Sequence, residues 1–517
     1  MCELNFDILE DYKNHIGKIL FAISIIILVY LFINPAMGCY FNIDEQFTLA
    51  ILNLPFNQAW KLIVNDVHPP LYYLILMAFK GLFNTLHVSI DLLYLTKLLS
   101  LLPLVLLMLI SCTKIRREYG WLACGVFMFG ITAMNNIGEI FIIGRMYSWS
   151  VLFMVIAFIA YMGVLKSSSV KSWVLLTVFT ILCMYTHYIL VFPLFIMYLA
   201  YFMYISYNDK LDKKSEKRKV ITSMVVSILC YIPWIFTLIR QVSAINRTYI
   251  HTAKLSGDVL VNYLTCFVLQ DTRQLLDMVF WKFLVFVLLI LIIVAFITEI
   301  KNFKNHEAFA IFSGINIYIF TILLASFFVT FMFKGITVRY FVAVIAVLWL
   351  AIAILLSKIK NYRILLVALI LILALGVHGI NTTVKDINYH NQLGIEQKDV
   401  TGDINKPDNI VIYNGTYNTY HFLLNNTEEY SLRDYTGDNG PSYIVEEDLD
   451  AIMDDHPDRN VYLISVLYKV KDNDVKINDN ITATKLSQQG RTYIMKLNKK
   501  APADENTTED TGENDTV

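Results

Sequence analysis

Two short stretches near the start of a very apolar chain carry residue types that could do chemistry. The first, NIDEQFTLA, holds Asp44 and Glu45, and the second, VNDVHPPLYYLILM, holds Asp66 and His68 ahead of a double proline. Ionisable side chains beside lipid are costly, so by default they indicate function. These four residues are therefore the first candidates for a site.

Asp44 is the expected general base. A carboxylate that faces a dry cavity can take the proton of a hydroxyl while that hydroxyl displaces another group. Glu45, its neighbour, would help to position the reacting groups. The structural alternative is that IDEQFTLA begins a helix, with Asp44 as the N-cap and Glu45 in the first turn. The two interpretations are compatible, because a capped helix start holds a carboxylate rigidly.

His68 is the expected partner of this base, and Asp66 is a further candidate. The double proline that follows would hold the imidazole against an acceptor or against the reacting carboxylate. The structural alternative is an interfacial histidine bonded to the backbone, beside an acid in a turn. Asp44, Asp66 and His68 also form a chemically reasonable set of metal ligands. Their spacing matches no standard motif, so no metal or other cofactor is expected to be required.

Three cations are expected to bind an anion such as a phosphate. Arg145 in GRMYSW and Arg339 in TVRYF each precede an apolar run, and Lys97 in YLTKLLS lies inside one. An arginine fork binds phosphate through two parallel hydrogen bonds, which favours this role. The alternative for the arginines is that they anchor helix ends by snorkelling to the interface.

The elements that must position these residues are mostly membrane-spanning helices. The chain has 517 residues, 56% of them hydrophobic and 16% charged, against about 25% charged in soluble domains. Apolar runs of about 18 residues or more predict transmembrane helices. About eleven spans are expected, near residues 18–35, 93–113, 121–139, 147–165, 173–189, 190–207, 220–239, 281–299, 308–333, 338–357 and 363–380.

Alternate loops are rich in Lys and Arg, which predicts that they are cytoplasmic. These loops lie near residues 114–117, 166–171, 210–219, 301–304 and 358–363. Residues 1–17 are then cytoplasmic, residues 18–380 form the membrane domain, and everything later lies outside. Glu139, His187 and Tyr340 fall at the outer side with the residues above, and are further site candidates. For His187, a buried structural histidine is the alternative.

Residues 36–92 are expected to form the first outside loop, with interfacial helices. The apolar stretch 70–83 begins at a double proline and is too short to cross a bilayer. Pro is well placed at a helix start, because its missing N–H has no partner there anyway.

A small extracytoplasmic α/β domain is expected over residues 381–500. Its predicted strands are NIVIY, VYLISVLY and TYIMKL, at 409–413, 461–468 and 492–497, and its predicted helix covers 442–453. The acidic tail, residues 501–517, is expected to be disordered.

Several classes of function are excluded or discounted. The net charge is −1 and no long basic stripe is present, so no nucleic-acid partner is expected. The sequence contains neither a Walker A loop nor a GxGxxG motif. The triplets DLD and DND resemble the acidic motif of nucleotide-sugar transferases, but they lie in the outside domain, away from cytosolic nucleotide sugars.

The motifs IDE, DVHPPLYY and YLTKLLS, in this order after the first span, resemble membrane glycosyltransferases of the GT-C class. The sequence is most similar to the protein O-mannosyltransferase-like family (glycosyltransferase family 39) and to the related RgtA/B/C/D-like and lipid A aminoarabinose transferase-like enzymes. The resemblance covers residues 18–360. Two departures are that Lys97 stands where the mannosyltransferases mostly have Arg, and that residues 381–517 lack their repeated lumenal β-domain.

The resemblance implies an inverting transfer of a sugar, such as a mannosyl or other hexosyl group, from a polyprenyl or dolichyl phosphate. The acceptor would be a hydroxyl of a lipid, glycan or protein at the outer face of the cell membrane. Asp44 would be the base, and Lys97, Arg145 and Arg339 would hold the donor phosphate. The alternative function is a flippase or transporter of lipid-linked oligosaccharide, which would use the same cavity without transfer chemistry. That class favours internal repeats, and none is apparent in the sequence.

Overall fold

The chain divides into two units that we describe separately. The first comprises Met1–Cys39 and Ile51–Asn391, and the second comprises Tyr40–Ala50 and Gln392–Val517. In the computed structural model, the described residues are 6–33, 43–248, 257–269, 275–300, 304–332, 337–414, 420, 424, 426–432, 442–465, 474–489 and 492–499. The predicted disordered tail, residues 501–517, lies outside them.

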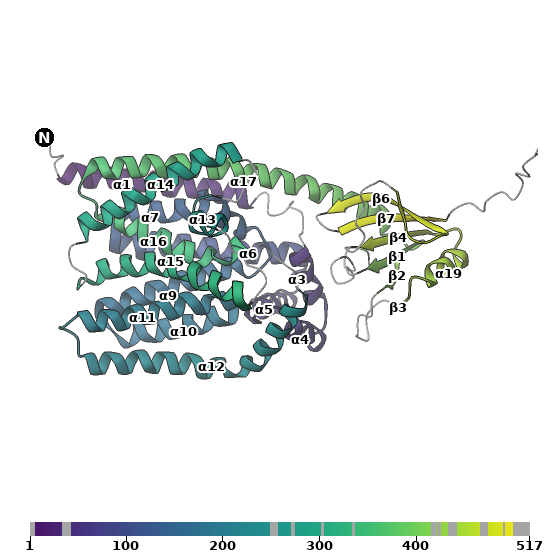
Figure 1. Cartoon of the computed structure of the whole chain (residues 1–517), viewed down its shortest axis with the longest axis horizontal. Helices are drawn as coiled ribbons and strands as arrows, with labels where there is room; N and C mark the ends of the chain where they lie inside the picture. The colour runs from purple at the N-terminus through teal and green to yellow at the C-terminus, as the bar shows by residue number, and fades with distance from the viewer. Residues whose placement is uncertain are drawn as a thin grey trace, which may run out of the picture. The chain divides into compact units, whose positions relative to one another are not determined.

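The first unit is a bundle of long helices that run side by side (Figure 1). Its helices are α1 (Phe6–Ile27), η1 (Leu28–Ile33), α4 (Phe56–Asn65), α5 (Leu71–Thr85), α6 (Leu92–Ile110), η2 (Ser111–Ile115), α7 (Arg116–Ala133), α8 (Asn135–Gly138), η3 (Glu139–Phe141), α9 (Tyr147–Ser167), α10 (Val170–Thr186), η4 (Tyr188–Leu190), α11 (Val191–Tyr207), α12 (Lys213–Thr248), α13 (Gly257–Thr265), α14 (Leu275–Glu299), α15 (His306–Met332), η5 (Val338–Tyr340) and α16 (Val342–Lys358). Two helices belong partly to each unit, namely α3 (Ile43–Asn53) and α17 (Tyr362–Ile404).

Among the described residues, 8 helical segments are long and apolar enough to cross a membrane, and two shorter apolar helices, Val170–Thr186 and Val342–Lys358, accompany them. One of the 8, Leu92–Ala133, contains α6, η2 and α7, and a positive φ of 83° at Gly120 interrupts it near the start of α7. The expected polytopic helical membrane protein is confirmed, and the count of eleven spans stays a prediction.

Close backbone contacts explain why small residues recur in the core of the bundle. A Cβ at Gly17 of α1 would lie 2.2 Å from the backbone of Trp121, and one at Gly125 of α7 would lie 2.1 Å from the carbonyl oxygen of Gly17. A Cβ at Gly130 would lie 2.3 Å from the indole of Trp349 on α16. Small residues let helices approach closely where van der Waals packing holds the bundle together.

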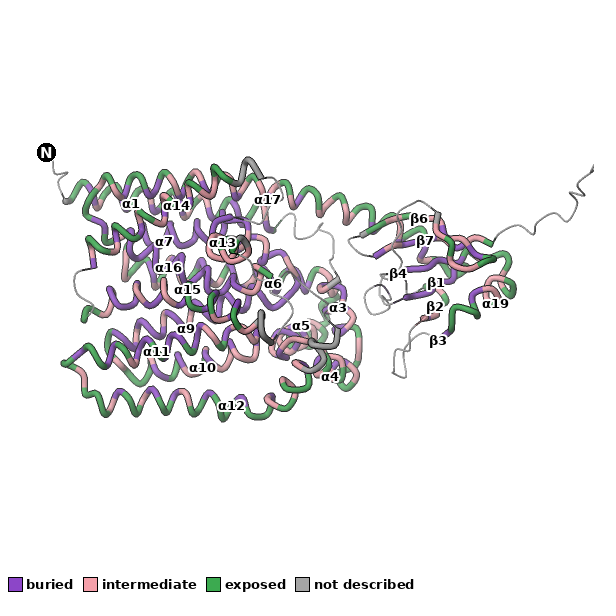
Figure 2. The backbone as a smooth tube through the Cα atoms, in the orientation of Figure 1, coloured by how far each residue is buried: buried purple, intermediate pink, exposed green. Residues whose placement is uncertain are grey.

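Burial separates central helices from peripheral ones. Nearly every residue of α9 and α16 is buried, whereas α12 and α14 expose much of their surface (Figure 2). The exposed residues of α12 and α14 include Leu229, Phe236, Phe283 and Phe286. A soluble protein rarely exposes large apolar side chains in contiguous rows. These rows therefore identify the surface that faces lipid.

The helices alternate in direction, so the connections gather at two ends of the bundle. At one end, Lys13 Nζ donates to the carbonyl oxygen of Ser357 at 3.0 Å, and Lys358 pairs with Glu307 at 2.9 Å. We call this the basic end; it is formed by the starts of α1, α7, α10, α12 and α15 and by the ends of α9 and α16. The opposite end is formed by α4, α5, residues 135–146, residues 187–190 and residues 337–341.

The second unit contains a seven-stranded sheet with the order β3-β2-β1-β4-β7-β6-β5. The strands are β1 (Asn409–Asn414), β2 (Glu428–Ser431), β3 (Ser442–Tyr443), β4 (Asn460–Ser465), β5 (Asp474–Lys476), β6 (Ile481–Gln489) and β7 (Thr492–Lys499), with one helix, α19 (Asp448–Asp455). Strands β1 to β4 pair in parallel, and β4, β7, β6 and β5 pair antiparallel.

Alternate residues of β1 pack on opposite faces of this sheet, as the period of a strand requires. Ile410 and Ile412 join one apolar cluster with Leu449 of α19, and Val411 and Tyr413 join the other. The small C-terminal domain with its strands at β1, β4 and β7 is confirmed. The helix predicted over 442–453 begins only at Asp448, because its first residues form β3.

Candidate functional site

The turn between α4 and α5 holds Asp66 and His68 at the opposite end of the bundle. Asp66 is the C-cap of α4, and Pro70 is the N-cap of α5, which is 15 residues long. The two prolines end one helix and start the next, so the acid and the imidazole lie in a short, fixed turn. Only 10% of the Asp66 side chain and 12% of the His68 side chain is exposed.

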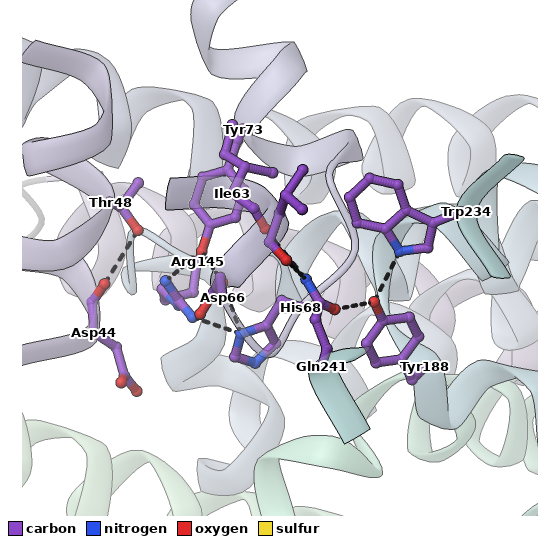
Figure 3. A network of polar contacts seen from close by, with 11 residues as sticks. Asp44, Thr48, Ile63, Asp66, His68, Tyr73, Arg145, Tyr188, Trp234 and Gln241 are labelled. Atoms are coloured by element: carbon purple, nitrogen blue, oxygen red, sulfur yellow. Dashed lines mark hydrogen bonds and ion pairs between the residues drawn. The ribbon is translucent and has the colours of Figure 1, made fainter. Parts of the chain in front are cut away.

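A tyrosine connects this turn to Arg145 (Figure 3). Tyr73 donates its hydroxyl hydrogen to Asp66 Oδ2 at 2.7 Å and accepts a hydrogen bond from Arg145 Nη1 at 3.0 Å. Arg145 is only 2% exposed. An acid, a phenol and a guanidinium from three separate segments are thus joined in one buried chain of hydrogen bonds.

His68 Nδ1 lies between the acid and the arginine. It is 3.2 Å from Asp66 Oδ2 and 3.1 Å from Arg145 Nη2. A nitrogen that carries hydrogen can donate to Asp66, and one without hydrogen can accept from Arg145. With a hydrogen on Nδ1, His68 donates to Asp66, and without one, Nδ1 accepts from Arg145. The ring can therefore change its hydrogen-bond partner without moving.

Asp66 is held as an anion. Burial alone would raise the pKa of its carboxyl, but the charge and hydrogen bond of His68, the charge of Arg145 and the hydroxyl of Tyr73 outweigh it. Together they lower the pKa of Asp66 from 3.8 to about 2. A carboxylate with so low a pKa is a weak base near neutral pH. Its hydrogen bonds to Tyr73 and His68 suit Asp66 to orienting the cluster.

Several aromatic rings pack together next to His68. The His187 ring lies 5.9 Å from the His68 ring, 5.8 Å from Tyr147 and 5.1 Å from Tyr340, centroid to centroid. The guanidinium of Arg339 stands 5.6 Å from the centre of the Tyr147 ring. The sequence-predicted candidates Asp66, His68, Arg145, His187, Arg339 and Tyr340 thus come together in one cluster, which we call the arginine cluster.

The arginine cluster carries an excess of positive charge. Arg145 and Arg339 contribute two positive charges and Asp66 one negative charge, which leaves +1 when both histidines are counted as neutral. The 21-residue helix α9 begins at Tyr147, two residues after Arg145. The start of a helix presents free N–H groups and a partial positive charge. The cluster is therefore suited chemically to an anionic ligand.

Lys97, expected to bind phosphate, has a backbone partner in the structure. It lies on α6, is only 1% exposed, and its Nζ donates to the carbonyl oxygen of Ile142 at 2.8 Å. Ile142 belongs to the turn that leads to Arg145, so this bond helps to fix the arginine. A direct contact of Lys97 with phosphate stays a prediction.

Glu139, another expected site residue, belongs to a separate cluster. Asn135 Nδ2 donates to Asp386 Oδ2 at 3.1 Å, and Thr383 donates to Asn135 Oδ1 at 2.8 Å. Burial first, and then the adjacent Asp386, raise the pKa of Glu139 well above 4.5. The fold therefore favours the protonated form of Glu139, and its contacts connect the turn after α7 to α17.

Asp44 and Glu45 lie in the first turn of α3, within the second unit. The predicted helix start is confirmed, but the helix begins at Ile43, so Asp44 lies within its first turn and is not the N-cap. Asp44 is half-buried, and its backbone carbonyl accepts a hydrogen bond from the Thr48 hydroxyl at 3.1 Å, whereas Glu45 is only 1% exposed. The role of Asp44 as base and of Glu45 in positioning stay predictions. Within the part of the chain that the structure describes, no three His, Cys, Asp or Glu residues form a metal-ligand set.

Sequence reasoning missed residues that brace the arginine cluster. Gln241 of α12 donates to the carbonyl oxygens of Ile63 and Val64 at 3.2 and 3.0 Å, and accepts from the Tyr188 hydroxyl (Figure 3). Trp234 Nε1 donates to the same hydroxyl at 2.8 Å. These bonds fix the end of α4 just before Asp66. The tyrosine of this set and Tyr73 look in the sequence like ordinary interfacial aromatics, so no local signal distinguishes them.

An apolar pocket of about 330 Å³ lies between η1, α5 and α6. Its lining includes Ile33 of η1, Phe79 and Phe83 of α5, and Leu98 and Val105 of α6. The pocket shares α5 with Tyr73 and α6 with Lys97. A polar cluster and an apolar pocket are thus built on the same helices.

The helical bundle, its short helices between the first two spans and the C-terminal sheet define the GT-C fold. The structure of ArnT from Cupriavidus metallidurans in the apo state has this fold, with a TM-score of 0.55, 10% sequence identity, and coverage of 92% of this chain and 97% of that chain. The structure of the same ArnT bound to undecaprenyl phosphate matches with a TM-score of 0.57 and 11% identity over the same shares of the two chains. No protein-family model and no curated protein sequence matches the chain.

Proposed function

We propose that the chain is an integral-membrane glycosyltransferase that moves a sugar from a polyprenyl or dolichyl phosphate to a hydroxyl acceptor. The observation that carries this proposal is the arginine cluster, in which two arginines and one ionised acid leave a positive charge at the start of α9. The shared fold with an ArnT bound to undecaprenyl phosphate supports a lipid-phosphate ligand. The apolar pocket on α5 and α6 is suited to the isoprenoid tail.

The proposed reaction is a direct displacement at the anomeric carbon. The acceptor oxygen forms a bond to that carbon from the face opposite the phosphate, and the bond between the carbon and the phosphate oxygen breaks. The electron pair of the broken bond stays on the lipid phosphate, and the sugar carbon inverts. The acceptor proton passes to Asp44, the proposed base, because a positioned carboxylate is suited to this transfer.

Each residue of the arginine cluster has a proposed part in this displacement. Arg145 and Arg339 would stabilise the negative charge that develops on the leaving phosphate, since fixed cations in a dry site act where charge appears. Asp66 and Tyr73 hold Arg145, and His68 positions the reacting groups. The bond from Lys97 to the turn before Arg145 favours a positioning role for the lysine.

The distribution of charge supports an orientation in the membrane. Lysines and arginines gather in the loops of the basic end, which the positive-inside rule places in the cytoplasm. The arginine cluster would then lie at the outer face of the cell membrane, with the N-terminus inside and the C-terminal sheet outside. A sugar donor with a lipid tail would reach the cluster from within the bilayer.

The test uses the full-length protein in nanodiscs with synthetic polyprenyl phosphate carrying a radiolabelled sugar. Mannosyl, glucosyl and aminoarabinosyl donors are supplied in turn, with a membrane extract of the source cells as acceptor. Release of polyprenyl phosphate together with label in a new product is the expected result. In proteoliposomes, label that crosses the bilayer on intact lipid, without released lipid phosphate, would instead show a flippase and overturn the proposal.

A further inference from the structure

His187 has one partnered and one unpartnered ring nitrogen. The residue follows α10 and precedes η4, and its Nδ1 accepts a hydrogen bond from the backbone N–H of Ile189 at 3.3 Å. The other nitrogen, Nε2, is buried and has no hydrogen-bond partner among the described residues. The whole residue is only 6% exposed.

The partner of Nδ1 determines which nitrogen carries the hydrogen. A nitrogen that accepts an N–H is unprotonated, so the neutral ring must carry its hydrogen on Nε2. Burial first, and then the positive charges of His68, Arg339 and Arg145, lower the pKa of His187 well below 6.5. The ring is therefore neutral under physiological conditions and presents a single N–H at Nε2. A buried donor without a partner is costly unless a ligand satisfies it.

The surroundings of His187 identify the chemistry of that ligand. The ring packs against His68, Tyr147 and Tyr340, with centroids 5.1 to 5.9 Å away. The guanidinium of Arg339 also lies over the ring of Tyr147. The Nε2 hydrogen therefore belongs to a cluster with excess positive charge, and an anionic oxygen is the acceptor that this cluster attracts.

We propose that His187 donates its Nε2 hydrogen to an oxygen of the phosphate group that Arg145 and Arg339 attract. The identity of the anion as a lipid phosphate rests on the proposed function, whereas the donor itself rests on the geometry. A neutral donor orients the phosphate without adding a third charge, so the product phosphate is held less tightly than it would be by three cations. His187 is thus a specificity-determining residue for the phosphate.

Two substitutions of His187 test the roles of its two ring nitrogens separately. In His187→Asn the amide can replace Nδ1 and keep the bond to Ile189, but nothing replaces Nε2. In His187→Gln the longer side chain places an amide N–H near the Nε2 position. We expect H187N to bind undecaprenyl phosphate about 10-fold more weakly than wild type, the cost of a hydrogen bond to a charged group. H187Q should stay within about 3-fold of wild type.

The measurement is ligand binding by the purified full-length protein in nanodiscs, with undecaprenyl phosphate, undecaprenol and inorganic phosphate as separate probes. Undecaprenol has the tail without the phosphate, so its binding should be equal in both variants and wild type. Dependence on His187 for the lipid phosphate alone identifies a lipid headgroup, and the same dependence for inorganic phosphate identifies the phosphate group by itself; both support the proposal.

Equal binding of undecaprenyl phosphate by H187N and wild type would overturn it. So would an equal loss in H187N and H187Q, because that pattern indicates a structural role for the ring. The melting temperature of each variant without ligand shows whether the fold is intact. No sugar is transferred in this assay, so its failure is distinct from the absence of sugar transfer in the activity test.

Discussion

The two ends of the helical bundle hold charge in different ways. At the basic end, Lys304 and Lys358 have 55% and 41% of their side chains exposed, and their partners Asp209 and Glu307 are also accessible. At the opposite end Arg145 is 2% exposed and is joined to Tyr73, Asp66 and His68. These exposed charges can be satisfied by water and lipid headgroups, whereas the buried charge of Arg145 requires specific protein partners.

The difference in burial of the charged side chains indicates which end of the bundle binds a ligand. Exposed ion pairs contribute little, about 0–1 kcal/mol each. Buried charges are expensive to desolvate, and the loss of one partner leaves the other uncompensated. Two charges at the basic end, on Lys13 and Glu216, are also buried, but Glu10 and Lys219 pair with them and leave no excess charge. The buried network with its excess positive charge is thus best explained by an anion that completes it.

The largest effect on sugar transfer is expected for substitution of Asp44, the proposed base. Asp44→Asn should reduce sugar transfer by about 10²–10⁴-fold, because it removes the proposed base, and should leave donor binding intact. Glu45→Gln distinguishes the two adjacent acids and should cost far less. Asp209→Asn is the matched control at the basic end, where the acid pairs with exposed lysines. Normal transfer by D44N would exclude Asp44 as the base.

Removal of the buried arginine should have the next largest effect. Arg145→Met is expected to lower kcat/KM for the lipid-phosphate donor by about 10²–10³-fold, as loss of a charge-stabilising donor does in other sites. Arg145→Lys should recover only part, because the ammonium lacks the fork. Arg117→Met, at an exposed position of the basic end, serves as the control and should change activity by less than about twofold. Equal effects at the two ends would remove the distinction between them.

Tyr73→Phe should have a smaller effect. The substitution removes one hydroxyl that donates to Asp66 and accepts from Arg145, and leaves the ring in place. We expect kcat/KM to fall by about 3- to 10-fold, equivalent to roughly 1 kcal/mol. Tyr72→Phe, at the adjacent buried position, is the matched control. If both variants behave alike, the hydroxyl of Tyr73 does not hold the arginine.

The smallest expected effect concerns stability at Glu139. Its folded pKa is raised above 4.5, so the unfolded chain releases this proton at a lower pH than the folded chain does. Stability is therefore lost as pH rises through and above 4.5, until the folded carboxyl also ionises. Glu139→Gln mimics the protonated acid, so its melting temperature should exceed that of wild type by about 2 °C at pH 8 and equal it near pH 4. A constant difference at both pH values would contradict the raised pKa of Glu139 in the folded protein.

The sequence predicted the types of residue in the arginine cluster well, because intramembrane charges are rare and conspicuous. Asp66, His68, Arg145, His187, Arg339 and Tyr340 were all candidates, and the structure brings them together. The roles of Glu139 and Lys97 in the same site stay predictions; the structure shows Glu139 beside Asp386, and Lys97 bonded to the carbonyl oxygen of Ile142. Those partners lie far away in sequence, and loop spacing alone contains no information on which turn a side chain faces.

The C-terminal sheet also shows that local sequence does not contain information on distant partners. Strands β1, β4 and β7 each contain several large apolar residues and were predicted, whereas β2, β5 and β6 are short or polar and were missed. Residues 442–447 resembled a helix start, yet Tyr430 and Ser431 of β2 pair with Ser442 and Tyr443 as β3. Cross-strand pairing decides such segments, and local preference does not.

Photo-crosslinking with an undecaprenyl phosphate analogue shows directly whether the arginine cluster binds the lipid phosphate. The analogue carries a diazirine on its first isoprene unit, and the labelled peptides of the full-length protein are mapped by mass spectrometry. Labels are expected within residues 64–77, 139–150, 187–190 or 337–342, and they should be lost on addition of undecaprenyl phosphate but not of undecaprenol. Labels confined to the basic end, for example within residues 209–219, or labels that undecaprenol removes equally well, would contradict this binding.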